Sequence, residues 1–213
     1  PSESGKIVVR LFSGEIGKVQ KILTPGLEKA ETDLDKLIKK GENFFCEFKE
    51  SALWSQNITE EEVQKSRSLE VHYYKKKASR IILAKSIAAF MNSEGGNLII
   101  GIQESKNDKL EIVGIEPEFS KLKDKYKDGY KRMILDEIIK PYFPSKILDN
   151  LNKQILIDFP VLDGKTVCWI RINKSDSRVF LTLESKEVFM IRIESENKSL
   201  EGEKLVDYCI RHF

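Results

Sequence analysis

Hydrophobic residues recur along the chain with two different periods, one typical of helices and one typical of strands. Apolar residues spaced three to four positions apart predict helices at residues 31–40, 74–91, 129–139 and 201–212. Alternating or continuous apolar runs predict strands at residues 6–12, 43–49, 97–102, 110–115, 153–159, 166–172, 179–183 and 188–193. We therefore predict an α+β fold with mixed, largely antiparallel sheets and helices packed against them.

Several boundaries in this pattern carry their own local signals. The helix at 31–40 is followed by Gly41, which tolerates the left-handed conformation that ends many helices. Thr59 begins a pattern typical of a capping box, which predicts a short helix at 59–63. The helix at 74–91 is apolar nearly all round in its second half, so we expect it to be buried. The pair Gly95 and Gly96 favours a tight turn; a close approach of phosphate to the backbone is the alternative.

The strand predicted at 43–49 places charged side chains on one face. Alternation puts Glu47 and Lys49 together with Phe45 and away from the opposite, apolar face. Many metal-dependent nucleases use this spacing, in which the carboxylate holds a divalent cation and the lysine stabilises charge on the phosphate. A salt-bridged, solvated strand face has the same pattern, so the spacing alone leaves both interpretations open.

Two further carboxylates are candidates for the same site. Glu42 lies at the junction between helix and strand, and Glu104 follows the strand predicted at 97–102. With Glu47 they would give Mg²⁺ or Mn²⁺ the oxygen ligands that these ions prefer. The alternative for Glu104 is an acidic hairpin residue without a partner. Convergence of the three carboxyl groups would favour an enzyme, and divergence would favour a binding module.

Composition narrows the function without naming it. The 213 residues are 40% hydrophobic and 33% charged, which is ordinary for a globular domain in water. No run is long and apolar enough to span a membrane, so we expect no membrane partner. The cysteines Cys46, Cys168 and Cys209 are too scattered for a zinc site or a disulfide framework, which predicts reduced thiols in the cytoplasm. The chain begins at Pro1 rather than Met, so we expect a processed chain or part of a longer protein.

A net charge of +2 does not indicate nucleic acid, so that hypothesis depends on local clusters. The best candidate surface combines lysines that neutralise phosphate with tyrosine that stacks on unpaired bases; it comprises Tyr74, Lys75, Lys76, Lys77 and Arg80, with Tyr73 beside them. A second lysine-rich stretch at 121–132 is diluted by Asp124 and Asp128. For both, a solvated helix face is the alternative.

Taken together, these segments resemble the Schlafen AlbA-like domain family. Residues 41–50, Gly-Glu-Asn-Phe-Phe-Cys-Glu-Phe-Lys-Glu, resemble the family's opening "E-S-x-x-x-E-F-K". Residues 87–102, from Ile-Ala-Ala-Phe-Met-Asn to Gly-Gly-Asn-Leu-Ile-Ile-Gly-Ile, are similar to its "I-x-A-F-A-N-T-x-G-G-x-L-x-I-G-V" signature. Weaker matches at 113–115, 139–141 and 189–213 follow in the same order. The resemblance implies a Schlafen-core-like fold over residues 30–213, preceded by a strand and linker at 1–29.

The resemblance also implies nucleic-acid binding, and RNA cleavage in the nuclease members. Their metal-binding acids correspond to Glu42, Glu47 and Glu104 here, with Lys49 beside them, which implies a Mg²⁺- or Mn²⁺-dependent endoribonuclease acting on structured RNA such as tRNA. Glu104 stands where those members have Asp, and Met91 and Glu194 also depart from the pattern. The alternative is a non-catalytic DNA- or RNA-binding module, with RNA favoured over DNA, that works with additional domains or as a homo-oligomer.

Overall fold

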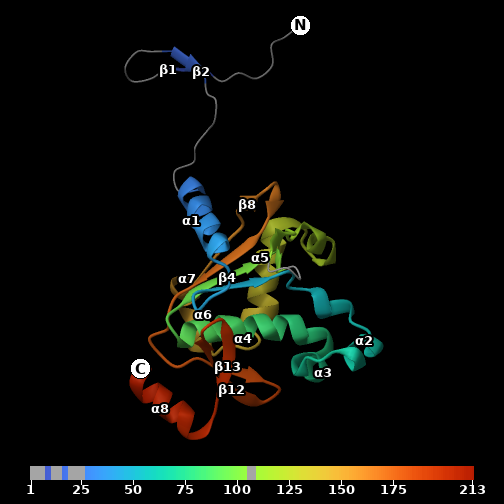
Figure 1. Ribbon diagram of the computed structural model, residues 1–213, viewed down its shortest axis with the longest axis vertical. Coiled ribbons are helices and arrows are strands. Elements are labelled where there is room, and N and C mark those ends of the chain that lie inside the picture. The colour runs from blue at the N-terminus through green and yellow to red at the C-terminus, as the bar shows by residue number, and fades with distance from the viewer. Residues whose placement is uncertain (1–7, 11–15, 19–26, 105–108) are drawn as a thin grey trace.

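The computed structural model describes residues 8–10, 16–18, 27–104 and 109–213, with side chains from residue 33 onward. Helix α4 (Ala78–Asn92) crosses the middle of the molecule, with one sheet on one side and a second sheet with α8 on the other (Figure 1). Twelve of its residues are buried, which confirms the burial predicted from its all-round apolarity. No helix in the described part of the chain is long and apolar enough to cross a membrane.

The larger sheet has four strands and lies against α4. Its order is β3 (Cys46–Lys49), β4 (Gly96–Ile100), β10 (Cys168–Ile172) and β7 (Ile155–Asp158). The pair β3–β4 is parallel and the other two pairs are antiparallel. This arrangement confirms the predicted α+β class with mixed, largely antiparallel sheets.

The second sheet has three antiparallel strands, β11 (Phe180–Leu183), β12 (Lys186–Ile193) and β13 (Glu196–Leu200). Three small hairpins complete the strands: β1 (Val8–Arg10) with β2 (Ile16–Lys18), β5 (Ile102–Glu104) with β6 (Leu110–Ile112), and β8 (Val161–Leu162) with β9 (Lys165–Thr166). The sequence did not predict β13, because this edge strand has no buried residue and hence no apolar alternation. The expected strand at 6–12 extends outside the described residues, which contain only its central part.

The remaining helical elements range from 3 residues in η2 to 14 residues in α1. They are α1 (Leu27–Lys40), η1 (Trp54–Asn57), α2 (Glu60–Lys65), α3 (Leu69–Tyr74), η2 (Lys75–Lys77), η3 (Glu116–Lys121), α5 (Tyr126–Met133), the π-helix η4 (Ile134–Ile139), α6 (Ser145–Asp149), α7 (Leu151–Gln154) and α8 (Gly202–His212). Both predicted local signals are confirmed: Gly41 has a φ of 72°, and Thr59 and Glu62 form both hydrogen bonds of a capping box.

The helix predicted at 74–91 is interrupted near its start, contrary to expectation. Lys75 has a φ of 46°, and the chain makes a 3₁₀ turn through Lys75–Lys77 before α4 begins at Ala78. None of these three lysines is buried. Since no packing holds them on a helical path, this segment leaves the axis that the buried part of α4 follows.

The four-stranded sheet is covered on both faces. Leu98 and Ile100 belong to the main core cluster around α4, whereas Ile99 packs in a second cluster with Leu34 of α1 and Trp169 of β10. All three β4 residues are fully buried, as their continuous apolar run predicted. The sheet therefore forms the middle layer between α1 and α4.

The turn that follows α4 joins the helix to both sheets. The Asn92 side chain donates to the carbonyls of Val179 and Met190 at 2.8 and 2.9 Å and accepts from the Val179 N–H at 2.8 Å. A Cβ on Gly95 would lie 2.6 Å from the Ile172 carbonyl oxygen, and one on Gly96 would lie 2.4 Å from the Phe90 ring. Close packing by protein atoms thus accounts for both glycines.

Replacing Asn92 by Ala should weaken the attachment of the second sheet. The change would leave the Val179 N–H and the carbonyls of Val179 and Met190 buried without their partners, at a cost of about 3 kcal/mol in the free energy of unfolding. Urea denaturation measures this loss. Asn152→Ala, at an exposed position in α7, is the control and should change stability by less than about 0.5 kcal/mol. Equal effects of the two substitutions would contradict the role given to Asn92.

Candidate functional site

Strand β3 lies at the edge of its sheet, and charged side chains cover its free backbone groups. The Phe48 N–H donates to Glu42 Oε1 at 2.7 Å, and Lys49 Nζ donates to the Phe48 carbonyl at 3.0 Å. Nearer the start of the strand, Asn43 and Cys46 exchange two backbone hydrogen bonds at 2.9 and 3.2 Å. Glu42 and Lys49, two of the predicted catalytic residues, therefore satisfy the free backbone groups of Phe48 and block the pairing of β3 with another strand.

Glu47 projects from β3 toward α4 and is 4% exposed. Its Oε1 accepts from Lys49 Nζ at 2.7 Å and from Ser86 Oγ at 2.9 Å. Its Oε2 accepts from Arg192 Nη1 at 2.5 Å and from Asn197 Nδ2 at 3.0 Å. Both carboxylate oxygens are thus fully engaged by two cations, a hydroxyl and an amide.

Arg192 lies on β12 and reaches the edge of the four-stranded sheet, where it forms this ion pair. Its side chain is fully buried, and Nη2 donates to the carbonyls of Asn43 and Cys46 at 3.0 and 3.2 Å. The guanidinium also lies 4.7 Å from the centroid of the Phe90 ring. The Glu47–Arg192 pair, with these accessory bonds, connects β3, α4 and β12.

Electrostatics keep Glu47 ionised and Cys46 neutral. Burial alone would raise the pKa of Glu47, but Lys49 and Arg192, together with the Asn197 amide, hold it below its ordinary value of 4.5. Burial raises the pKa of Cys46 to about 12, the nearby Glu42 and Glu47 add to this effect, and Arg192 opposes it. Cys46 is therefore a protonated core thiol rather than a nucleophile.

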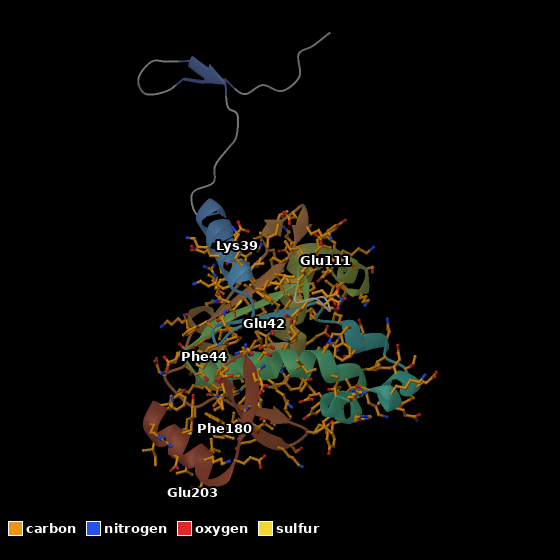
Figure 2. The ribbon with its side chains drawn as sticks, in the orientation of Figure 1. Lys39, Glu42, Phe44, Glu111, Phe180 and Glu203 are labelled. Atoms are coloured by element: carbon orange, nitrogen blue, oxygen red, sulfur yellow. The ribbon has the colours of Figure 1, made fainter. Side chains whose placement is uncertain are left out.

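The three carboxylates predicted as metal ligands do not form one cluster. Glu42 lies just beyond α1 and bonds to the β3 backbone, Glu47 is buried against α4, and Glu104 is exposed at the end of β5 in the hairpin that also carries Glu111 (Figure 2). Among the residues that the structure describes, no three or more His, Cys, Asp or Glu side chains are placed to hold a metal ion. As arranged, this set does not fit Mg²⁺ or Mn²⁺, because Lys49 and Arg192 occupy the Glu47 oxygens. Their catalytic and metal-binding roles stay predictions.

Ser86 and Asn197 complete the Glu47 site and were missed from the sequence. Ser86 lies inside the apolar α4, where a small polar residue gives no signal of its own, and Asn197 lies in the unpredicted β13. Two arginines of the predicted strands at 166–172 and 188–193, Arg171 and Arg192, could flank the site or pair with glutamates. Arg192 pairs with Glu47, whereas Arg171 lies in the other sheet, where it pairs with Asp158 and stacks over the Trp169 ring.

The predicted basic surface is formed around the break before α4. Tyr74 and Lys75–Lys77 line a hollow of about 310 Å³ together with Tyr73 and Glu184. Tyr73 is 72% exposed. Lys75 pairs with Glu60 at 3.1 Å, whereas Lys76 and Lys77 make no ion pair with another described residue. We call the surface of Tyr73, Tyr74 and Lys75–Lys77 the tyrosine–lysine surface.

Arg80, which the sequence grouped with this surface, faces elsewhere. It pairs with Glu137 of η4 at 2.6 Å and lines a separate hollow of about 230 Å³ with Lys121 and Lys123. Arg132 of the same hollow is paired with Asp124. Residues three positions apart in the sequence are thus separated because Lys75–Lys77 depart from the helix axis.

Comparison with known proteins places this architecture in a family. Residues 42–201, which are more than half of the chain, match the family described as Schlafen, AlbA_2. The chain belongs to the Schlafen AlbA_2 family. This membership confirms the family resemblance read from residues 41–50 and 87–102. No protein with a curated description matches the chain.

Two solved structures are similar to this Schlafen AlbA_2 chain. The crystal structure of the DIP2311 protein from Corynebacterium diphtheriae has a TM-score of 0.49 and 13% identity, over 87% of this chain and 33% of that one. The solution structure of the N-terminal domain of a RecG-related protein from Nitrosomonas europaea has a TM-score of 0.42 and 16% identity, over 80% of this chain and 92% of that one. The chain spans about a third of the first of these proteins.

Removing the charge of Glu47 should strongly destabilise the domain. Glu47→Gln leaves Arg192 buried without its anion, which should cost about 3–5 kcal/mol in the free energy of unfolding at neutral pH. Because the folded pKa of Glu47 lies below 4.5, its contribution is present above that pH and is lost as the pH falls through the folded pKa. The stability of the parent should therefore decline more steeply below pH 4.5 than that of Glu47→Gln.

Denaturant unfolding over a range of pH measures both effects. Glu196→Gln is the matched control, because Glu196 pairs with Lys198 at 3.3 Å on the exposed strand β13. It should change stability by less than about 1 kcal/mol. Similar losses of stability for the two variants would show that the buried ion pair contributes no more to folding than the exposed one.

Proposed function

We propose that this domain binds nucleic acid through the tyrosine–lysine surface, with RNA favoured over DNA. The observation that carries the proposal is the exposed ring of Tyr73 beside Lys76 and Lys77, neither of which is ion-paired with a described residue. Lysines attract phosphate groups, and an exposed aromatic ring stacks on unpaired bases. Single-stranded RNA loops present such bases more often than duplex DNA does.

Membership in the Schlafen AlbA_2 family supports this proposal, since the family resemblance implies nucleic-acid binding. We place the domain in the cytoplasm, where its three buried free thiols would stay reduced. Further domains or a second copy of the chain would add to the binding surface. In this proposal the domain is a binding module, and Glu47 and Lys49 serve its architecture.

Replacing Tyr73 by Ala tests the stacking role. Loss of one base–aromatic stack should weaken binding of single-stranded RNA by about 1–3 kcal/mol and leave binding of duplex RNA nearly unchanged. Fluorescence anisotropy with both labelled RNAs measures the difference. Phe45→Ala is the control, since Phe45 is an aromatic residue that is 51% exposed and lies outside both lysine-rich stretches. Equal weakening by both substitutions, or equal effects on single strands and duplexes, would argue against the proposal.

A metal-dependent endoribonuclease acting on structured RNA such as tRNA is the second proposal. What favours it is the family motif, which places Glu42, Glu47 and Lys49 within one strand and its junction. The ionic partners of Glu47 argue for the binding module instead, because a divalent cation would have to compete with Lys49 and Arg192. Glu104, exposed and free of this network, allows a test that does not disturb the core.

If the domain is a nuclease, Glu104→Gln should abolish Mn²⁺-dependent cleavage of tRNA, because it removes a negatively charged ligand. Glu111→Gln is the control, since Glu111 is exposed on the partner strand of the same hairpin, opposite Gln103. Gel analysis of total tRNA incubated with Mn²⁺ or with a chelator reports the cleavage. No metal-dependent cleavage by the parent would leave the binding module as the function, whereas full metal-dependent cleavage by Glu104→Gln would remove Glu104 from the proposed metal site.

A further inference from the structure

A second positively charged region lies at the opposite end of α4 from the tyrosine–lysine surface. Two adjoining hollows of about 240 and 380 Å³ lie between α6–α7 and the segment at 173–179. They share Lys146, Asp176 and Ser177 in their walls. We call this region the α7 groove and define it by Lys146, Lys153, Gln154, Ser175–177, Arg178 and Phe213.

The α7 groove has an excess of unpaired positive charge. Lys146, Lys153 and Arg178 are exposed, and none of them makes an ion pair with another described residue. Asp176 is the acidic side chain of the groove, so its side chains comprise three cations and one carboxylate. The hollow at the tyrosine–lysine surface has three lysines but also Glu60 and Glu184. Positive side chains outnumber negative ones in both hollows, which favours an anion in each.

Hydrogen bonds to backbone carbonyls hold the walls of the groove in place. The Asn173 N–H donates to the Gln154 carbonyl at 2.8 Å, and its side chain donates to the Lys153 carbonyl at 2.7 Å. The Ser175 N–H donates to the Met91 carbonyl at 2.8 Å. The segment that carries Asp176 and Arg178 is thus tied to α7 and to the end of α4. A ligand would bind without first ordering these walls, which lowers the entropic cost of binding.

Uncharged groups in the groove suit the remainder of a nucleotide. Phe213 lines the mouth beside Arg178 and is 39% exposed, so its ring offers a stacking surface. Gln154 also lines the groove, and its buried Oε1 accepts no hydrogen bond from any described residue. A phosphate group alone does not stack on an aromatic ring or need an amide oxygen as acceptor. A nucleotide also has a base that stacks and hydroxyl or amino groups that donate hydrogen bonds.

We propose that the α7 groove binds the phosphate groups of a nucleotide unit, with Lys146, Lys153 and Arg178 at the phosphates and Phe213 against the base. Within the proposed function, on which this step rests, the unit belongs to the nucleic-acid strand that also contacts the tyrosine–lysine surface. The two surfaces lie beyond opposite ends of the 15-residue α4, which is about 22 Å long. The same chemistry would accept a free mononucleotide.

Removing the three cations together tests the proposal on the full chain. Lys146→Ala/Lys153→Ala/Arg178→Ala should weaken binding of single-stranded RNA and reduce the slope of log affinity against log salt by about 2, since roughly 0.7 counterions are released per phosphate contact. Lys36→Ala/Lys198→Ala/Lys204→Ala removes the same charge from exposed positions outside both surfaces and should leave the slope unchanged. Circular dichroism of both variants should match that of the parent, because every replaced side chain is exposed.

A second measurement separates failure of the groove from failure of the proposed function. AMP and inorganic pyrophosphate are titrated into ¹⁵N-labelled parent and triple variant, and the amide signals of Ser175, Ser177 and Phe213 are followed. Shifts in the parent that vanish in the groove variant support the site, even if the parent binds no RNA and the proposed function fails. If the amide signals shift but the triple variant keeps the parent's slope of log RNA affinity against log salt, the groove binds free nucleotides, and the proposal that it contacts the RNA strand is wrong. No shifts together with an unchanged slope overturn the proposal.

Discussion

The buried ion pair between Glu47 and Arg192 is the constraint on which the arrangement of the two sheets depends. The partners are 145 positions apart in the sequence and lie on strands of different sheets. Removing two charges from water is costly, so the pair is favourable only where further donors and acceptors satisfy both groups. Lys49, Ser86 and Asn197 do this for Glu47. For Arg192, the Asn197 side chain and the Asn43 and Cys46 carbonyls accept from the two Nη atoms, and Nε has no partner among the described residues. A shift of either sheet along α4 would leave a charge buried alone, which fixes their relative position.

The same ion pair gives the acidic motif of this Schlafen AlbA_2 chain a structural role. Glu42 and Lys49 cover the free edge of β3, and Glu47 joins that strand to β12, so these three charged residues of the motif have partners within the fold. These contacts give the three side chains structural roles, and their metal-binding roles stay predictions. The side chains that remain available to a ligand are instead the cations that make no ion pair with another described residue.

Helix α4 organises those cations as well as the core. The chain turns out of the helix axis through Lys75–Lys77 at its start, and the Met91 carbonyl and Asn92 side chain hold the segment at 173–179 at its end. Both positively charged surfaces thus depend on one rigid, buried helix. Their separation is fixed by its length, which suits a partner that is extended and carries charge at intervals, such as a nucleic-acid strand.

Signals that act over a few residues were readable from the sequence. Gly41 ended α1, the capping box at Thr59 began α2, and continuous apolarity placed β4 between two layers. These succeed because the backbone conformation of a glycine, a cap or an apolar run is decided largely by its neighbours in the chain. The family was readable for a related reason, since its motif at 87–102 is long and continuous.

Only the tertiary structure decided which distant side chains meet. The alternation in the sequence placed Glu47 on one face of a strand, but its partners Arg192 and Asn197 lie 145 and 150 positions away in the chain. The same holds for the α7 groove, whose cations lie in three separate segments, and for Arg80, which the turn at Lys75 directs away from its sequence neighbours. Packing of α4 against two sheets sets these distances, and no local pattern of polar and apolar residues encodes them.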